Sequence, residues 1–235
     1  MRIAIFSDIH ANLEALEAIV SDIKINHFDK VYFLGDALSK GPSPRECLEL
    51  IMENDIEMTL GNHELYFLHG VEIDNLISDI EKEHQAWIKS LLIDKHREYL
   101  EKCDIEKYLE VDGIKFSFRH FLCKDISKKY PFYLIDVLNT NYINDIIENQ
   151  EEDVMFIGHE HRIFEINHMN KRLIDVGSSG CLDKDKTYYM ILEIKDGKYT
   201  LEKKIISYDR EKFEKTFSES DYPEKDIIAG IFFGL

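Results

Sequence analysis

The sequence contains few of the residues that build linkers, disulfide frameworks or membrane spans. Its 235 residues include 11 glycines and 4 prolines, which leaves little material for a flexible interdomain linker. Its cysteines are widely separated and form no Cys-x-x-Cys pair, so we expect reduced, mostly buried thiols and no structural zinc site. The four are Cys47, Cys103, Cys123 and Cys181. No apolar run approaches the roughly 18 residues that cross a bilayer.

Basic residues are also few in comparison with acidic ones. The chain has 29 Lys and Arg against 46 Asp and Glu, which gives a formal net charge of −17. A bare nucleic-acid duplex and an anionic membrane both need clustered positive charge, so the composition argues against either partner. The early apolar stretch at residues 3–6 is too short for a secretory signal, and we therefore expect a cytoplasmic protein.

Apolar and aromatic side chains are abundant, at 44% and 11% of the residues. These fractions suffice for a sizeable core and exclude a disordered or low-complexity chain. Because the sequence also lacks an internal repeat, we expect a single domain over residues 1–235.

Strand and helix patterns alternate over the first sixty residues. Short apolar strands are predicted at residues 2–6, 31–34 and 56–60. A helix over residues 13–23 follows Asn12 as its N-cap, and Pro44 suits the first turn of a second helix. This strand–helix–strand order predicts a mostly parallel sheet covered by helices.

The middle of the chain is strongly charged. Residues 73–103 carry apolar side chains at helical intervals, which predicts one or two amphipathic helices. We expect a helical cap insertion at about residues 65–107. Trp87 in this segment is assigned to packing, with stacking on a nucleobase as the less favoured alternative.

The second half of the chain returns to strands. Hairpin turns are predicted at Asp112-Gly113, Met169-Asn170 and Asp196-Gly197. A strand at residues 114–118 follows the first of these turns. A helix is predicted over residues 133–148 and a buried strand over residues 154–157. A charged helix near residues 210–217 and an apolar tail at residues 227–233 close the chain.

Four predicted strands are each followed by similar polar residues. The four segments are Ser7-Asp8-Ile9-His10, Gly35-Asp36, Gly61-Asn62-His63 and Gly158-His159-Glu160-His161. Ligands of open α/β sheets bind at the carboxyl ends of strands, and a spacing of two sends both side chains of a pair to one side. We therefore expect Asp, Asn and His side chains to converge on one rim. Oxygen and nitrogen donors without thiolate suit Mn, Fe, Ni, Co or Zn.

In these motifs and their order the sequence resembles the calcineurin-like metallophosphoesterase family. The motifs span residues 8–161 and include His120, which follows an apolar strand. The stretches at residues 9–16 and 41–47 resemble the small bacterial branch of the family. The resemblance implies a four-layer α-β-β-α sandwich of two mixed sheets, with metal ions at the strand ends.

The resemblance also implies two divalent metal ions and their ligands. By position, the ligands are Asp8, His10 and His161 for the first ion, Asn62, His120 and His159 for the second, and Asp36 as the bridge. His120 departs from the family pattern, because Phe121 follows it where a glycine is usual. A hydroxide bridging the ions would attack phosphorus, and His63 would protonate the leaving group. Glu64 is assigned to the first turn of a helix, where the dipole favours a carboxylate.

Substrate contacts are less well marked. The eukaryotic phosphatases of the family carry an Asp-Arg pair before Gly41-Pro42, where this chain has Ser39-Lys40. Lys40 and Arg119 are candidates for contact with a substrate phosphate, with a solvated surface role as the alternative. The segment at residues 176–180 is either a phosphate contact or a simple turn.

These expectations together predict metal-dependent hydrolysis of a small phosphodiester or nucleotide-type phosphate ester. A diadenosine polyphosphate hydrolase is the first alternative. A phosphoprotein phosphatase is disfavoured by the missing arginine. The fold also occurs as a non-catalytic scaffold, as in the retromer subunit, but scaffolds lose the catalytic histidine that is kept here as His63. The expected partner is a small phosphorylated substrate and not a membrane, and the sequence leaves open whether the chain forms a homo-oligomer.

Overall fold

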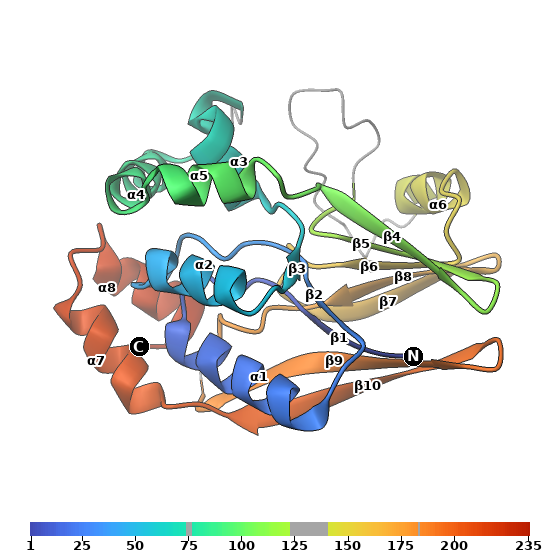
Figure 1. The fold of residues 1–235 in the computed structure, drawn as a ribbon. Helices are drawn as coiled ribbons and strands as arrows, with labels where there is room; N and C mark the ends of the chain where they lie inside the picture. Colours follow the sequence, from blue (N-terminus) through green and yellow to red (C-terminus); the bar gives the residue numbers. More distant parts are fainter. Residues whose placement is uncertain (74–76, 123–140, 183) are drawn as a thin grey trace.

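The structure is a computed structural model that describes residues 1–73, 77–122, 141–182 and 184–235. Two five-stranded sheets lie face to face, one above the other in Figure 1. Each sheet combines parallel and antiparallel neighbours. The predicted pair of mixed sheets is therefore confirmed.

The first sheet is built from three early strands and two late strands of the chain. Its strands, in spatial order, are β10 (Lys198–Ser207), β9 (Lys186–Lys195), β1 (Arg2–Phe6), β2 (Lys30–Phe33) and β3 (Glu57–Met58). The three early strands are parallel, and β9 joins β1 in antiparallel register. β3 is shorter than predicted: the N–H of Thr59 still donates to Phe33 of β2, but that of Leu60 donates to Asp104.

The second sheet is built from the middle of the chain. Its strands, in spatial order, are β4 (Glu106–Val111), β5 (Ile114–Arg119), β6 (Val154–Ile157), β8 (Lys171–Val176) and β7 (Ile163–His168). The strands β5, β6 and β8 are parallel, and the hairpins β4–β5 and β7–β8 flank them. All three predicted hairpin turns are confirmed: Asp112, Met169 and Asp196 have positive φ at the turns.

Helices begin where the sequence offers suitable end groups. The helices of the first half are α1 (Leu13–Asn26), α2 (Pro44–Glu53), α3 (Asn62–His69), α4 (Asp79–Leu91) and α5 (Asp94–Leu100). The side chain of Asn12 accepts the backbone N–H of Ala15 at 3.1 Å, and Pro44 opens α2, both as predicted. Ser78 caps α4 in the same way as Asn12 caps α1.

The remaining helices lie in the second half. They are α6 (Asn141–Glu148), α7 (Arg210–Glu219) and α8 (Lys225–Ile228), which continues into a π-helical turn at Ala229–Phe233. Part of the helix predicted over residues 133–148 lies outside the described residues, and α6 is the part within them. Cys123 also lies outside them, and the described cysteines are free thiols. No helix within the described ranges is long and apolar enough to cross a membrane.

Apolar side chains fill three layers between and outside the sheets. The rings of Tyr32 and Phe118 stack across the two sheets at 4.0 Å, and Phe156 lies 5.4 Å from Phe118. Helices α1 and α2 cover the outer face of the first sheet, and α6 covers that of the second through Ile143 and Ile147. Burying each such side chain contributes about 1.5–3 kcal/mol before entropy is counted. The order of layers is the predicted α-β-β-α.

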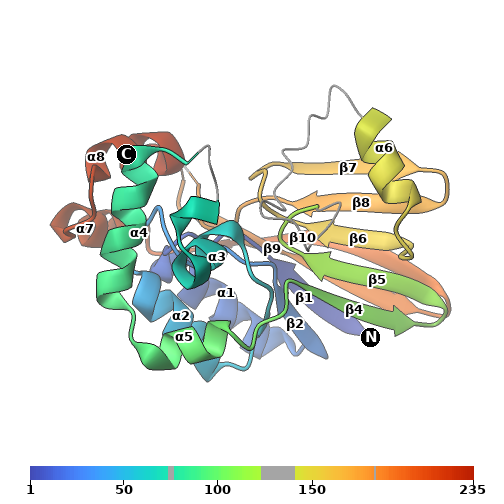
Figure 2. The ribbon, with the colours of Figure 1, turned by 90° about the horizontal axis from the view of Figure 1, so that it is seen from above.

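The charged segment after α3 forms helices, as predicted for residues 73–103. α4 packs on α3 and runs beside the C-terminal segment (Figure 2). Trp87 meets the ring of Tyr222 edge to face at 5.0 Å, which is the packing role favoured for it. The bounds of a cap at about residues 65–107, and the single-domain organisation, stay predictions.

Candidate metal centre

One hollow of about 300 Å³ is lined by polar residues that follow β1, β2 and β6 or lie at the start of α3. The structure brings together all seven side chains that the sequence singled out as metal ligands. These seven, the rim ligands, are Asp8, His10, Asp36, Asn62, His120, His159 and His161. Asp8 and His120 are fully buried and lie next to Asp36, which lines the hollow. The hollow is also lined by His63, Lys40, Glu160 and Phe232.

Three rim ligands form one group of donor atoms. Nε2 of His10 lies 2.9 Å from Nε2 of His161. Oδ1 of Asp8 lies 3.6 Å from the first of these nitrogens and 3.3 Å from the second. Distances of this size between donor atoms are those of ligands that share one ion, since metal–ligand bonds are about 2.0–2.2 Å long.

Three further rim ligands form a second group. Oδ1 of Asn62 lies 3.2 Å from Nε2 of His120 and 3.0 Å from Nδ1 of His159. The two imidazole nitrogens are 3.3 Å apart. Asp36 stands between the groups: its Oδ2 lies 3.2 Å from His120 and 3.8 Å from His10. One carboxylate is thus within reach of both sets of donors.

The loops that carry these side chains have an unusual backbone. The residues Asp8, His10, Asp36, His159 and His161 all have positive φ, between 47° and 74°. Such conformations cost free energy for residues with a Cβ and cluster at functional sites. The loops also approach closely, because a Cβ on Gly61 would lie 2.1 Å from Oδ1 of Asp36 and one on Gly158 would lie 2.4 Å from Oδ2 of Asp8. The glycines after the strands are therefore needed for contact between loops.

Burial and mutual charge set the protonation of the rim ligands. Burial acts to raise the pKa of Asp8 and of Asp36, but the neighbouring histidines outweigh it and lower both. Burial lowers the pKa of His10 and of His159 to about 4. His120 differs: burial acts to lower its pKa, yet Asp36 and Asp8 raise it to about 9. Ionised carboxylates and unprotonated imidazoles are the forms that bind cations, and at His120 a cation would compete with a proton.

The donor set fits a pair of divalent ions. Oδ1 of Asp8 is buried and has no hydrogen-bond partner among the described residues. An acceptor left without a donor in a protein interior costs about 1–3 kcal/mol, and a cation would satisfy it. Carboxylate, amide oxygen and imidazole are ligands of divalent transition metals. The residues therefore suit the ions that the sequence implied.

His63 lies beside the rim ligands on the first turn of α3. Its Nε2 is 3.8 Å from Oδ2 of Asp36. Its Nδ1 is 3.1 Å from Oε1 of Glu81, a carboxylate of α4 with 10% of its side chain exposed. The same oxygen accepts hydrogen bonds from Ser39 Oγ and Gln85 Nε2, and Lys40 pairs with Oε2. One ring nitrogen of His63 is thus fixed by α4 and the other faces the hollow.

Comparison with known proteins now decides the family. A sequence model of the calcineurin-like phosphoesterase superfamily domain matches residues 1–197. The chain belongs to this superfamily. An uncharacterized protein of Methanocaldococcus jannaschii is 31% identical over 186 residues, which cover 79% of this chain and 72% of that protein. Members of the superfamily depend on two metal ions.

Two further similarities concern a solved structure and a short stretch of sequence. The crystal structure of a metallophosphoesterase from Sphaerobacter thermophilus superposes with a TM-score of 0.74, at 24% identity and full coverage of both chains. A symmetrical bis(5'-nucleosyl)-tetraphosphatase of Neisseria gonorrhoeae is 36% identical over 64 residues, which cover 26% of this chain and 23% of that enzyme. The superfamily fold is therefore clear, and the second similarity covers only a short stretch.

Glu64 has a larger role than the one expected from the sequence, which was a favourable interaction with the helix dipole. Its carboxylate is fully buried and accepts four backbone N–H groups. Three come from Asp36, Ala37 and Leu38 at 2.8–3.1 Å, and one from Gly61 at 2.8 Å. Burial is the main cause that raises the pKa of Glu64 to about 7. Glu64 ties the loop carrying Asp36 to the start of α3, and the first-turn position alone did not reveal this.

The two candidate substrate cations occupy different places. Lys40 lines the hollow, and its ammonium is paired with Glu81. Arg119 does not reach the hollow. Its guanidinium is 2.8 Å from Glu106 and 3.5 Å from Glu152, on the side of the second sheet away from the rim. The carboxylates of neighbouring strands neutralise Arg119, so its assignment as a substrate contact is not supported.

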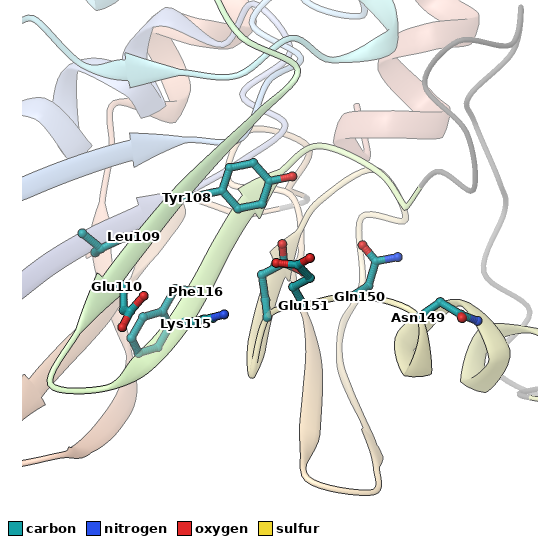
Figure 3. A pocket seen from close by; sticks show the side chains of 9 residues that line it. Tyr108, Leu109, Glu110, Lys115, Phe116, Asn149, Gln150 and Glu151 are labelled. Carbon is teal, nitrogen blue, oxygen red and sulfur yellow. The ribbon is translucent and has the colours of Figure 1, made fainter.

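A larger hollow, of about 540 Å³, lies beside Arg119 on the β4–β5 hairpin. Figure 3 shows Tyr108 and Lys115 along the hairpin, with Gln150 and Glu151 on the facing loop. Its lining contains no histidine and shares no residue with the rim hollow. The histidine and carboxylate cluster therefore lies at the smaller of these two hollows.

Residues 176–180 contact the backbone of the loop that carries Asp8. Ser178 Oγ and the backbone N–H of Gly180 both donate to the carbonyl oxygen of Asp8, at 2.8 and 3.1 Å. A Cβ on Gly180 would lie 1.8 Å from the carbonyl oxygen of Ile9. The segment thus holds the backbone of Asp8, and contact with a phosphate stays a prediction.

Proposed function

We propose that this chain hydrolyses a small phosphodiester or nucleotide-type phosphate ester at the rim. The observation that carries the proposal is the meeting of two three-donor groups on either side of Asp36, next to His63. In the proposal, Asp8, His10 and His161 hold one divalent ion, Asn62, His120 and His159 hold a second, and Asp36 contacts both. When bound, the two ions supply positive charge for the phosphoryl oxygens and lower the pKa of a water molecule.

His63 supplies the proton for the leaving group. Nδ1 lies between Glu81 and Gln85 of α4, at 3.1 and 3.2 Å, so the ring keeps one orientation; in the protonated ring the Nε2–H faces the hollow. That proton passes from Nε2 to the leaving oxygen as the ester bond breaks, and the Nδ1–H stays on the ring. Glu81 stabilises the charged ring before the transfer and so acts as a positioning residue.

The first test is turnover of bis-p-nitrophenyl phosphate and p-nitrophenyl phosphate with added manganese. We expect turnover that stops with a chelator, and the ratio of the two rates separates a diesterase from a monoesterase. His63→Ala should keep its metal and lose about 100- to 10,000-fold of turnover. His69→Ala, on the exposed end of the same helix, is the matched control. Bound metal with no turnover of either ester would instead support the non-catalytic scaffold.

A second candidate is hydrolysis of diadenosine tetraphosphate. It is favoured by the 36% identity with the symmetrical bis(5'-nucleosyl)-tetraphosphatase, although that similarity spans only 64 residues. Chromatography of the products distinguishes symmetrical cleavage, which gives only ADP, from asymmetrical cleavage, which gives AMP and ATP. A phosphoprotein phosphatase is less well supported, because Ser39-Lys40 offers no bidentate arginine clamp. A cytoplasmic location belongs to the same proposal.

A further inference from the structure

The C-terminal residues beyond the matched family domain contribute to the wall of the rim hollow. The family model ends at residue 197, whereas Phe232 lines the hollow. Its ring centroid lies 6.5 Å from that of His10 and 6.0 Å from that of His161. The side chain is half-buried, unlike the fully buried Phe233 beside it. An aromatic surface thus stands next to the proposed first ion.

The position of Phe232 is fixed by its neighbours. Phe233 packs against the rings of Phe213 and Phe217, at 4.9 and 5.5 Å. Nη2 of Arg210 donates to the carbonyl oxygen of Phe233 at 2.6 Å. Phe232 and Phe233 belong to the π-helical turn Ala229–Phe233, and such turns are frequent at functional sites. A ring held in place before a ligand arrives lowers the entropy cost of binding.

The same segment is joined to the loop that carries Lys40. The backbone N–H of Lys40 donates to the hydroxyl of Tyr222 at 2.8 Å. The ring of His84 lies 4.4 Å from that of Tyr222, which places the C-terminal segment against α4, as Figure 2 shows. Nζ of Lys40 lies 5.0 Å from the centroid of Phe232. Aromatic ring and cation therefore stand together on one wall.

We infer that Phe232 is a stacking platform for the planar base of a nucleotide-type substrate, and so a residue that determines specificity. The inference rests on the proposed function. A phosphate at the rim ligands leaves its organic group to extend toward the wall, where Phe232 offers a π-face. Stacking of a base on an aromatic side chain increases affinity about 5- to 100-fold and tolerates different bases.

The test compares two ligands that differ only by the base, AMP and ribose 5-phosphate. Binding of each to the manganese-loaded protein is measured by titration calorimetry. The wild type should bind AMP about 5- to 100-fold more tightly than ribose 5-phosphate. Phe232→Ala should remove that preference and leave the affinity for ribose 5-phosphate within about twofold. Phe232→Trp should keep the preference, whereas Phe232→Leu, which has bulk but no π-face, should lose most of it.

Ile231→Ala is the control, because Ile231 lies on the same turn and is 69% exposed. It should bind both ligands as the wild type does. The inference is overturned if the wild type shows no preference for AMP, including the case in which neither ligand binds, or if Phe232→Ala keeps the preference. Turnover of bis-p-nitrophenyl phosphate by the same preparation separates the two hypotheses. Turnover without a base preference contradicts only this inference, whereas no ester turnover contradicts the proposed function.

Discussion

Oε1 of Glu81 lies 3.1 Å from Nδ1 of His63, although the two residues belong to different helices, and Nε2 of Gln85 lies 3.2 Å from the same nitrogen. Glu81 is also the acceptor for Ser39 and Gln85 and the partner of Lys40. A carboxylate with this many donors keeps one geometry, so it fixes the ring of His63 relative to Asp36. The helix α4 is thereby part of the site and not merely a neighbour of it.

Glu81→Gln should lower kcat for a phosphate ester by about 10- to 1,000-fold, because the neutral amide no longer stabilises a charged His63. KM and bound metal should change little, since Glu81 is not a rim ligand. Steady-state kinetics together with metal analysis check both statements. Glu83→Gln, an exposed change on the same helix, is the control and should have no effect. A wild-type kcat in the Glu81 variant would show that the hydrogen bond has no role in turnover.

Asp36→Asn should lose bound metal. Oδ2 of Asp36 lies within reach of both groups of donors, and an amide at this position would put a neutral oxygen or a nitrogen where the carboxylate has a charged oxygen. We expect metal content after dialysis to fall from two ions toward one or none per chain, measured by inductively coupled plasma mass spectrometry. Asp196→Asn is the control, because that residue sits in a hairpin turn with φ of 51°, a conformation that asparagine also tolerates. Retention of two ions in the Asp36 variant would contradict the bridging position.

Glu64→Gln should destabilise the fold by roughly 3–5 kcal/mol. The amide nitrogen would face backbone N–H groups that now donate to a carboxylate oxygen, and buried donors without acceptors are costly. Urea unfolding measures the change. Glu46→Gln is the matched control, because Glu46 lies in the first turn of α2 but is exposed. It should cost under about 0.5 kcal/mol, as expected for the dipole alone. If the two variants lost the same free energy of unfolding, Glu64 would act only through the helix dipole.

Asp175→Asn should change how stability depends on pH. Burial raises the pKa of Asp175 from an ordinary 3.8 to about 9, and only its Oδ1 has a partner, the N–H of Gly177 at 2.7 Å. Between these pH values the folded chain holds a proton that the unfolded chain releases. The free energy of unfolding therefore falls as pH rises through this window.

Asparagine cannot ionise, so the variant should be more stable than the wild type by roughly 1–3 kcal/mol at pH 7, with a smaller difference near pH 4. Urea unfolding of both proteins at several pH values gives the difference directly. Asp185→Asn, at an exposed position, should follow the wild type throughout. A difference between wild type and Asp175→Asn that does not grow with pH would contradict the raised pKa.

Strand ends and spacings in the sequence predicted a parallel sheet and brought together six of the seven rim ligands, because carboxyl ends of parallel strands meet at one edge. The pair of mixed sheets and the place of His120 followed from the family resemblance. Pairs such as His159 and His161 do meet at the rim, but their positive φ shows that strand alternation is not the cause. The bridging position of Asp36 followed from family resemblance and agrees with the distances around Oδ2. Their roles as ligands stay a proposal until metal is measured.

Other parts of the site could not be predicted from local pattern. Glu81 reaches His63 only because α4 packs on α3, and Phe232 arrives through the packing of Phe233. Arg119 was singled out because it precedes His120 in the sequence, but its guanidinium forms an ion pair with Glu106 on the neighbouring strand of the hairpin. Such contacts depend on tertiary packing, to which neither spacing nor residue type gives access.

The support of Asp8 by residues 178 and 180 has a consequence for the order of assembly. Asp8 leaves the ribosome early, but both donors to its carbonyl oxygen are translated about 170 residues later. A nascent chain that stops before Ser178 can form β1, α1 and β2 but lacks the brace for the loop of Asp8. Contacts between such distant segments form slowly. A cation held by Asp8 would therefore be captured late, after the second sheet has been synthesised.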